Sequence, residues 1–192
     1  ILGNQQYQGV TAGMPGRHNV DNAVAAACLA QNVGMGIETI AQGISSFTGV
    51  KRRFDVHINQ EDVVYLDDYA HHPTELRQLI TSLRELHPGR EIAMLFQPHL
   101  YSRTQDFMQD FIEVLSSIEH LALLPIYPAR ELPIEGVRSE VICKALDASL
   151  QTEATAAAWL ASHDKAIMVT AGAGDIDRQV PRVIANLQSR LS

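Results

Sequence analysis

A single short segment concentrates side chains that can carry charge, protons or a metal ion. Residues 67–72 read Asp-Asp-Tyr-Ala-His-His, so two carboxylates, a phenol and two imidazoles lie within six positions. The apolar run Val-Val-Tyr-Leu at 63–66 predicts a strand before this segment, and Pro73 suits the first position of a helix after it. In open α/β sheets, ligands bind outside the carboxyl ends of strands. A strand-to-helix turn so rich in charge therefore indicates a binding site.

Three further polar clusters occupy equivalent positions along the chain. They comprise residues 97–103, 127–131 and 171–175, and they follow predicted strands that end near residues 96, 125 and 170. In a parallel sheet the carboxyl ends of the strands meet at one edge, so all four clusters should face the same rim. The sequence therefore predicts one site along one rim of the domain.

Alternating strand and helix patterns begin at residue 54. We expect strands at 54–58, 62–67, 91–96, 119–124 and 166–170, and helices at about 73–86, 104–117, 138–146, 155–162 and 179–191. Such alternation predicts an α/β fold with a doubly wound, mostly parallel sheet, Rossmann-like, that carries helices on both faces.

The first 48 residues follow a different pattern. Helices are expected at 19–33 and 37–46, and no strand there is long enough to complete a core. We interpret residues 1–48 as the last two helices of an incomplete domain and residues 49–192 as a second, complete domain. The chain has no initiator Met, which suggests truncation or cleavage.

Bulk composition narrows the possible functions. Apolar residues make up 46 % and charged residues 19 % of 192, which is typical of a globular protein. The net charge of −7 argues against nucleic acid or an anionic membrane as a partner. No apolar run approaches the roughly 20 residues that span a bilayer, and no signal peptide is evident. Cys28 and Cys143, in separate helical patterns, are expected to be buried, reduced thiols, which fits a cytoplasmic protein.

The rim clusters suggest how a ligand is held. Arg103 can bind a carboxylate or phosphate through two parallel hydrogen bonds, and Asp68 can accept from ribose hydroxyls or pair with a cation. Gly172 and Gly174 let the backbone approach a ligand closely. The chain contains no G-x-x-x-x-G-K-[ST] loop. We therefore expect it to hold part of a nucleotide without its own phosphate cradle.

Five segments, in order, resemble the Mur ligase family over nearly the whole chain. They are Gly-Arg-His-Asn-Val-Asp-Asn at 16–22, Lys-Arg-Arg-Phe at 51–54, Asp-Asp-Tyr-Ala-His-His-Pro-Thr-Glu at 67–75, Phe-Gln-Pro-His-Leu-Tyr-Ser-Arg-Thr at 96–104 and Ala-Gly-Ala-Gly-Asp-Ile at 171–176. The resemblance implies a bacterial, cytoplasmic, ATP-dependent ligase of peptidoglycan precursor synthesis. It would join L-alanine to UDP-N-acetylmuramate through an acyl phosphate. The family's P-loop and Mg ligands belong to an amino-terminal part, so this chain alone should neither bind Mg·ATP tightly nor turn over.

The resemblance also implies roles for individual residues. His18, Asn19 and Asn22 would face the adenine of ATP from the central ATP-binding domain, to which residues 1–48 would belong. Arg53 would reach the nucleotide and Asp68 the ribose, with Lys51 and Arg52 left as surface or ion-pair residues. His99 and Arg103, with Tyr69 and His72 nearby, would line the pocket for alanine, and Arg103 would take its carboxylate. Leu100 stands where some members carry a second arginine.

Three alternatives stay open at this stage. A related ligase with another amine substrate, such as murein peptide, shares the His-His-Pro-Thr-Glu turn. A zinc hydrolase would use Asp67, His71, His72 and His99, although no pair has helical H-x-x-x-H spacing. A non-catalytic binding module derived from a ligase domain would carry the same residues.

Overall fold

The computed structural model describes residues 10–191, apart from the side chains of His18 and Leu191. The chain forms two compact units, divided between Lys51 and Arg52. The structure defines each unit by itself. In the described part of the first unit, two helices pack together, α1 (Arg17–Asn32) and α2 (Ile37–Ser46). Both helices were expected from the sequence.

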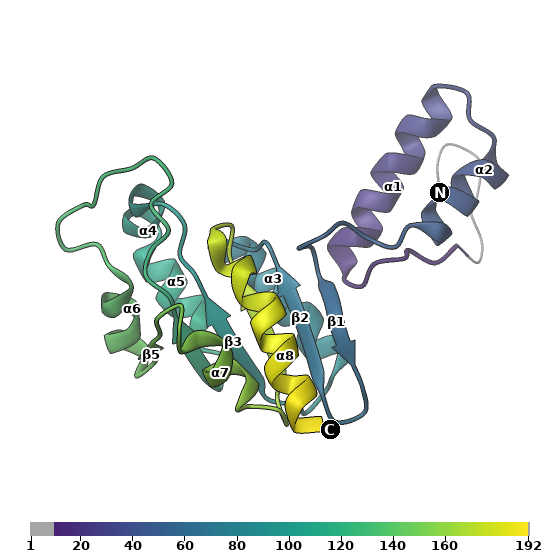
Figure 1. Ribbon diagram of the computed structural model, residues 1–192. Coiled ribbons are helices and arrows are strands. Elements are labelled where there is room, and N and C mark those ends of the chain that lie inside the picture. The colour runs from purple at the N-terminus through teal and green to yellow at the C-terminus, as the bar shows by residue number, and fades with distance from the viewer. Residues whose placement is uncertain (1–9, 192) are drawn as a thin grey trace. The chain divides into compact units, whose positions relative to one another are not determined.

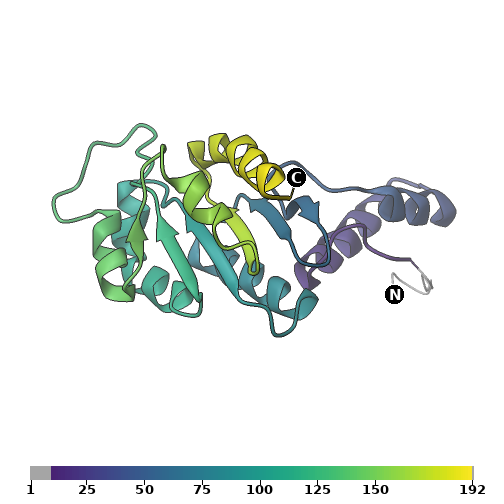
Figure 2. The same ribbon diagram turned by 60° about the horizontal axis from the view of Figure 1, so that its bottom comes forward.

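The second unit is a six-stranded sheet with helices on both faces (Figures 1 and 2). Its strands are β1 (Asp55–Asn59), β2 (Val64–Asp68), β3 (Ile92–Phe96), β4 (His120–Leu123), β5 (Ser149–Leu150) and β6 (Ile167–Ala171). Its helices are α3 (Pro73–Leu86), α4 (Tyr101–Asp106), α5 (Met108–Leu115), α6 (Ser139–Leu146), α7 (Ala156–Ala161), the 3₁₀ helix η1 (Asp175–Gln179) and α8 (Val180–Leu191).

The sheet order is β1-β2-β6-β3-β4-β5, and every pair except β1–β2 is parallel. The β1–β2 pair is antiparallel because the connection between the two strands is short, and only antiparallel strands can be joined by a tight turn. The Gln60 N–H closes this turn by donating to the Val63 carbonyl at 2.9 Å. The prediction of a mostly parallel, doubly wound sheet is confirmed.

The direction of each crossover decides which face its helix covers. From β2 to β5 the chain moves toward one edge of the sheet, and right-handed connections place α3, α5 and α6 on one face. It then returns through α7 to β6, so α7 and α8 cover the opposite face, where they pack on a core that includes Tyr65, Met168 and Leu187. The chain thus leaves β6 toward one face and its neighbours β2 and β3 toward the other. At such a reversal of strand order, α/β proteins bind their ligands beyond the carboxyl ends of the strands.

Two details differ from the expected elements. A single helix was expected at 104–117, but α4 begins at Tyr101 and the helix is interrupted at Phe107, whose backbone leaves helical geometry (φ −114°, ψ 19°). The Phe107 ring packs there against His72, with ring centroids 4.5 Å apart. Strand β5 was not expected, because two residues are too few for an alternating pattern to register.

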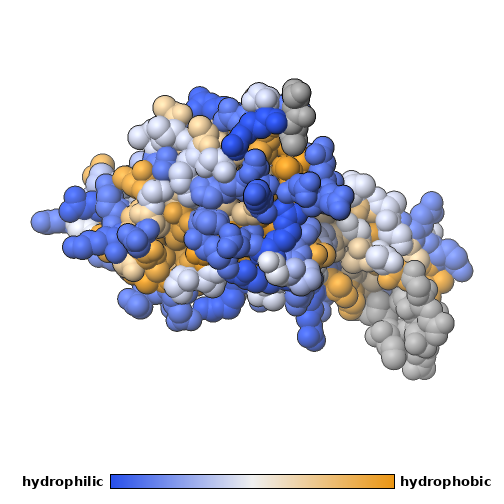
Figure 3. Space-filling model, turned by 90° about the horizontal axis from the view of Figure 1, so that it is seen from below, coloured by the Kyte–Doolittle hydropathy of each residue, from blue (hydrophilic) through white to orange (hydrophobic). Residues whose placement is uncertain are grey.

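The described helices include none that is both long and apolar enough to cross a membrane. On the side of the larger unit seen in Figure 3, polar side chains predominate and apolar atoms show in smaller patches between them. Both cysteines are free; Cys143 is buried as expected, whereas Cys28 is only partly buried.

Candidate functional site

Asp67 and Asp68, at the end of β2, project to opposite faces of the sheet, because side chains alternate along a strand. Asp67 turns toward the face that α8 covers and is 1 % exposed. It accepts a 2.7 Å hydrogen bond from the Thr170 hydroxyl, which also contacts the buried Tyr65 hydroxyl at 3.1 Å. Burial raises the pKa of Asp67, while the Thr170 hydroxyl and the Arg52 guanidinium lower it. Asp67 is therefore part of the core beneath the rim.

Arg52 is the cation that balances this buried carboxylate. Its Nε lies 3.4 Å from Asp67 Oδ2, and its guanidinium also donates to the carbonyls of Gly172 (2.6 Å) and Gly174 (3.3 Å). The group lies over the Tyr69 ring, 5.1 Å from its centroid, and its side chain is 15 % exposed. The expectation of an ion-pair residue is met, but Arg52 is not a surface residue.

Asp68 projects to the sheet face opposite α8, where it accepts hydrogen bonds from two backbone segments. Its Oδ2 accepts from the Phe54 N–H and its Oδ1 from the Ala70 N–H, both at 2.7 Å. Burial raises the pKa of Asp68, and these two hydrogen bonds oppose that effect. By holding Phe54, Asp68 also fixes the backbone beside Arg53, whose exposed side chain forms no hydrogen bond or ion pair among the described residues.

The glycine turn after β6 packs against protein atoms. A Cβ at Gly174 would lie 2.5 Å from Gln97 Oε1 and 2.7 Å from Tyr127 Cβ, and Gly172 adopts φ 148° with a Cβ position 2.7 Å from the Gln97 carbonyl oxygen. Gln97 closes the turn by donating to Asp175 and accepting from the Ile176 N–H, each at 2.9 Å. The close approach predicted for a ligand is thus made by Gln97, Tyr127 and the Arg52 guanidinium.

A row of four aromatic rings runs along the rim. Tyr69 contacts His71 (5.3 Å between centroids), His71 contacts His99 (5.7 Å), and His99 stacks on Tyr127 (5.6 Å, 16° between planes). These rings come from the segments that follow β2, β3 and β4, so the side chains that were expected to share one rim do lie together. Tyr69 is the exposed end of the row.

His99 and Arg103 form a polar pair beside this row. Arginine only donates, so the 3.4 Å contact between Arg103 Nη1 and His99 Nδ1 requires an unprotonated Nδ1. Burial lowers the pKa of His99, the neighbouring His71 and Arg103 lower it further, and Glu131 opposes them. Burial and the neighbouring cation thus favour the neutral form of His99, and the remaining guanidinium N–H groups of Arg103 have no hydrogen-bond partner among the described residues. Because His99 carries no negative charge, the positive charge of Arg103 is left available to bind an anion.

His72 turns away from the pair. It is the N-cap of α3, where its Nδ1 accepts from the Thr74 N–H at 3.2 Å. Glu75 completes a capping box by accepting from the N–H groups of His71 and His72. The His72 ring contacts the Phe107 ring. Of the four residues assigned to the substrate pocket, Tyr69 and His99 belong to the ring row and Arg103 contacts His99, whereas His72 caps α3.

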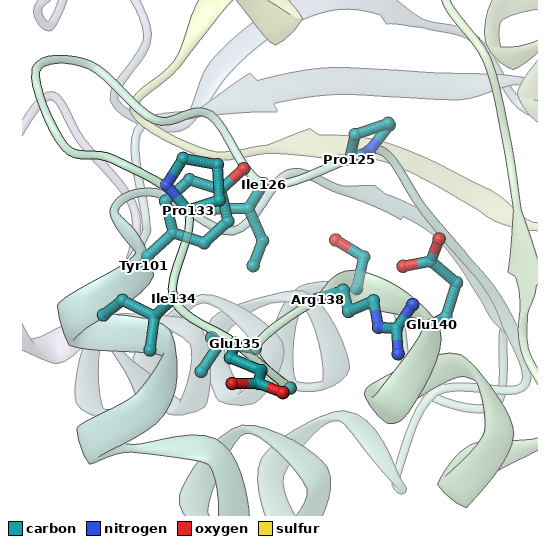
Figure 4. A pocket seen from close by; sticks show the side chains of 11 residues that line it. Tyr101, Pro125, Ile126, Pro133, Ile134, Glu135, Arg138 and Glu140 are labelled. Carbon is teal, nitrogen blue, oxygen red and sulfur yellow. The ribbon is translucent and has the colours of Figure 1, made fainter.

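The segment after β4 closes the far end of the rim. Tyr127 pairs with the His99 segment through a parallel bridge, and Glu131 hydrogen-bonds Ser102 at the start of α4. The same loop continues around a pocket of about 460 Å³, in which Tyr101 lies beside Pro133 and Arg138 lies near Glu140 (Figure 4). The sequence placed residues 127–131 at the rim but assigned them no role.

The residues expected at the adenine lie in the first unit. Asn19 and Asn22 are three positions apart on α1; the Asn19 amide donates to the Pro15 carbonyl at 2.6 Å, and Asn22 is exposed. Gly16, with φ 94°, is the N-cap of α1, so Asn19 lies inside the first turn of the helix and not at its cap. The side chain of His18 lies outside the described residues.

Among the described residues, no three His, Cys, Asp or Glu side chains are placed to hold a metal ion together. His71 and His72, adjacent in sequence, have separate partners, Tyr69 and Thr74. The zinc alternative therefore gains no support from the arrangement of its donors.

Comparison with known proteins identifies the family. The family model described as the glutamate ligase domain of Mur ligases matches residues 52–177, which is the sheet unit up to its glycine turn. The chain belongs to the Mur ligase family. Members of this family are ATP-dependent ligases that form amide bonds.

Curated relatives agree with one another in name. The UDP-N-acetylmuramate–L-alanine ligase of Cytophaga hutchinsonii is 44 % identical over 176 residues, which cover 90 % of this chain and 38 % of the relative. The ligase of the same name from Porphyromonas gingivalis is 45 % identical over 188 residues, covering 96 % of this chain and 41 % of the relative. The chain thus spans about two fifths of the length of these relatives.

Solved structures of other Mur ligases share the fold. A UDP-N-acetylmuramate–alanine ligase from Thermotoga maritima superposes with a TM-score of 0.77 at 24 % identity, over 97 % of this chain and 41 % of that one. A murein peptide ligase from Psychrobacter arcticus reaches 0.60 at 22 % identity, over 91 % and 38 %. At these identities the likeness concerns the fold alone.

Proposed function

We propose that this chain is part of a ligase that uses ATP to join L-alanine to the muramoyl carboxylate of UDP-N-acetylmuramate. The observation that carries the proposal is the position of Arg103 beside His99, with guanidinium donors that have no partner among the described residues and can bind an amino-acid carboxylate. Relatives 44–45 % identical bear this ligase's name. Peptidoglycan precursor synthesis in the bacterial cytoplasm is the setting we infer from them.

The proposed chemistry asks little of protein nucleophiles. ATP converts the muramoyl carboxylate into an acyl phosphate, and the amine of alanine then replaces the phosphate. The protein's contribution is to position the amine and its carboxylate. In this assignment Arg103 binds the carboxylate, and His99 keeps the guanidinium in place without adding a charge. Tyr69 borders the same space from the end of β2.

The nucleotide roles stay proposals with one structural argument each. Arg53 is exposed and unbonded among the described residues, so its guanidinium is available to a phosphate. Each Asp68 oxygen already accepts one backbone hydrogen bond and keeps a second lone pair for a ribose hydroxyl. Asn22 is exposed on α1, so its side-chain amide is available to hydrogen-bond the adenine. Asn19 and His18 are assigned to the adenine from the family pattern alone. Because these 192 residues contain no P-loop, we assign the phosphate-binding loop and the Mg ligands to another part of the ligase, with Arg53 as an additional contact.

Amine specificity is tested directly with the full-length protein. Incorporation of radiolabelled alanine into a UDP-muramoyl product, dependent on ATP, is expected to exceed incorporation of a murein tripeptide by at least tenfold. A preference for the tripeptide would instead identify a murein-peptide ligase, which shares the fold. Absence of any ATP-dependent amide formation would favour the non-catalytic module.

The Arg103 assignment gives a quantitative prediction. A charged hydrogen bond contributes about 1.5–3 kcal/mol, so Arg103→Ala should raise the KM for alanine about 10- to 150-fold and leave the KM for ATP nearly unchanged. Steady-state kinetics of the full-length enzyme measure both. Arg130→Ala is the matched control, since Arg130 is exposed in the neighbouring loop and has no bonded partner among the described residues. An unchanged KM for alanine in Arg103→Ala would refute the assignment.

A further inference from the structure

The residues that hold Arg103 in place come from the loop after β4. Arg103 lies in α4, a helix of six residues that follows Leu100. Leu100 adopts φ 72°, a conformation that costs a non-glycine residue energy unless its surroundings impose it. A short helix that begins at a strained residue does not fix its own orientation. The surrounding contacts must therefore do so.

Backbone contacts from Tyr127 supply the first constraint. The Leu100 N–H donates to the Tyr127 carbonyl at 2.9 Å, and the Tyr127 N–H donates to the Pro98 carbonyl at 2.8 Å. These two bonds pin the chain on both sides of His99. The Tyr127 ring stacks on the His99 ring and so limits its rotation.

The Glu131 carboxylate supplies the second constraint. The first N–H groups of a helix have no acceptor within the helix, and Ser102 is in that first turn. Glu131 accepts from the Ser102 N–H at 2.9 Å and from the Ser102 hydroxyl at 2.5 Å. A carboxylate at a helix N-terminus also complements the helix dipole. Glu131 therefore holds the turn of α4 next to Arg103.

We propose that Tyr127 and Glu131 are positioning residues, which hold His99 and Arg103 in the geometry that binds the substrate carboxylate. The kinetic effect of this positioning role rests on the proposed function, whereas the contacts of Tyr127 and Glu131 with the His99–Arg103 segment are present without a ligand. The loop is suited to the task because it is braced on its far side, where Val137 and Ser139 are buried and the Ser139 hydroxyl donates to the Leu124 carbonyl at 2.7 Å.

The same loop offers a matched control. Glu135 is an exposed glutamate four residues after Glu131, and it forms no hydrogen bond or ion pair among the described residues (Figure 4). Glu131→Ala and Glu135→Ala therefore remove the same group from one loop, and only the first removes contacts with α4. Glu131→Gln keeps one acceptor oxygen and should behave between Glu131→Ala and the unmodified protein.

Kinetics of the full-length protein give the first readout. Glu131→Ala is expected to raise the KM for alanine at least fivefold with the KM for ATP within twofold, Glu131→Gln to recover part of that loss, and Glu135→Ala to change neither. A general loss of folding would lower kcat and raise both KM values together. If Glu131→Ala leaves the KM for alanine unchanged while Arg103→Ala raises it, the positioning role is wrong and the proposed function stands.

Amide hydrogen exchange and NMR of the 192-residue chain give a second readout that needs no substrate. Glu131→Ala should lower protection of the Ser102 amide at least tenfold and shift the His99 ring resonances, with β6 amides unchanged. Glu135→Ala should do neither. Unaltered Ser102 protection and His99 resonances would overturn the proposal, whatever the fate of the Arg103 assignment.

Discussion

At the scale of single residues, two neighbouring arginines with the same sequence signal have different environments. Arg52 lies against Asp67 and the glycine turn, whereas Arg53 is exposed. The difference originates in the backbone, because Arg52 and Phe54 both adopt positive φ (63° and 50°) and so reverse the direction in which the side chains project. Arg52 also donates from its own N–H to the Asp55 carboxylate at 3.2 Å.

This pair gives a prediction for stability. Arg52→Ala leaves the Asp67 carboxylate buried without its cation, which should cost about 2–3 kcal/mol and lower Tm by roughly 5–10 °C. Arg53→Ala should change Tm by less than about 2 °C, because an exposed side chain without bonded partners contributes little. Thermal unfolding followed by circular dichroism measures both. Equal effects of the two substitutions would contradict the role of Arg52 as the cation that balances Asp67.

The buried Asp67 also gives a prediction for pH. Because burial raises its pKa above the unfolded value of 3.8, the folded state binds this proton more tightly than the unfolded state does. The free energy of unfolding should therefore fall as pH rises from 3.8 through the raised pKa, relative to Asp67→Asn, which cannot titrate. Urea titrations of both chains at several pH values between 4 and 7 give the difference. A difference that grows with pH would mean that the pKa is lowered.

These residues show what could be read from sequence and what could not. The positions of Asp67, His99 and Arg103 at strand ends followed from apolar runs, which are a strong local signal. The resemblance left Arg52 as a surface or ion-pair residue, but its burial against Asp67 had no sequence signal, since positive φ at two non-glycine residues depends on tertiary contacts. Glu131 was placed at the rim, but its partner Ser102, 29 positions earlier, is set by packing and not by any motif.

At the scale of elements, His72 stabilises the start of helix α3 as its N-cap. His72 caps α3 and Glu75 accepts from the N–H groups before it, so the His-His-Pro-Thr-Glu run is in large part a helix start. Pro73 at the first helical position was expected from sequence, and it is found there. By contrast, the break at Phe107 had no signal, because no glycine or proline marks it.

A substitution can separate capping from substrate binding at His72. Asparagine is among the best N-cap residues, so His72→Asn should keep the free energy of unfolding within about 0.5 kcal/mol, while His72→Ala should lose about 1 kcal/mol. Chemical denaturation of the chain tests this. A rise in the KM for alanine in His72→Asn of the full-length enzyme, with stability kept, would assign His72 a role in binding. Equal destabilisation by both substitutions would argue against the cap.

At the scale of the molecule, the two units differ in how well they cover their apolar residues. The second unit buries a continuous core on both faces of its sheet. In the first unit, Val20 and Val24 of α1 are about half exposed, at 49 % and 48 %. Helix existence was readable from periodicity, but the degree of burial depends on neighbours that periodicity does not reveal.

This contrast predicts independent folding of one unit. A fragment of residues 52–192 should fold cooperatively, with a Tm within about 5 °C of the main transition of the whole chain, because its core contacts lie within it. A fragment of residues 1–51 should show little stable helix, since few of the apolar side chains that the structure describes in it are covered. Circular dichroism of the two fragments measures both. Loss of cooperativity in residues 52–192 would place part of its core in the first unit.

Strand order was the part of the architecture that alternation could not reveal. It has a consequence for biosynthesis, because β6 is the last strand to be made and lies between β2 and β3. A nascent chain that ends before Ile167 therefore has a gap in the middle of its sheet, flanked by two unpaired strands. Neither the α7–α8 face nor the glycine turn can exist at that stage. The contacts of Arg52 with the Gly172 and Gly174 carbonyls can therefore form only after those residues have been made, and a chain that stops before Ile167 leaves two strand edges open to aggregation.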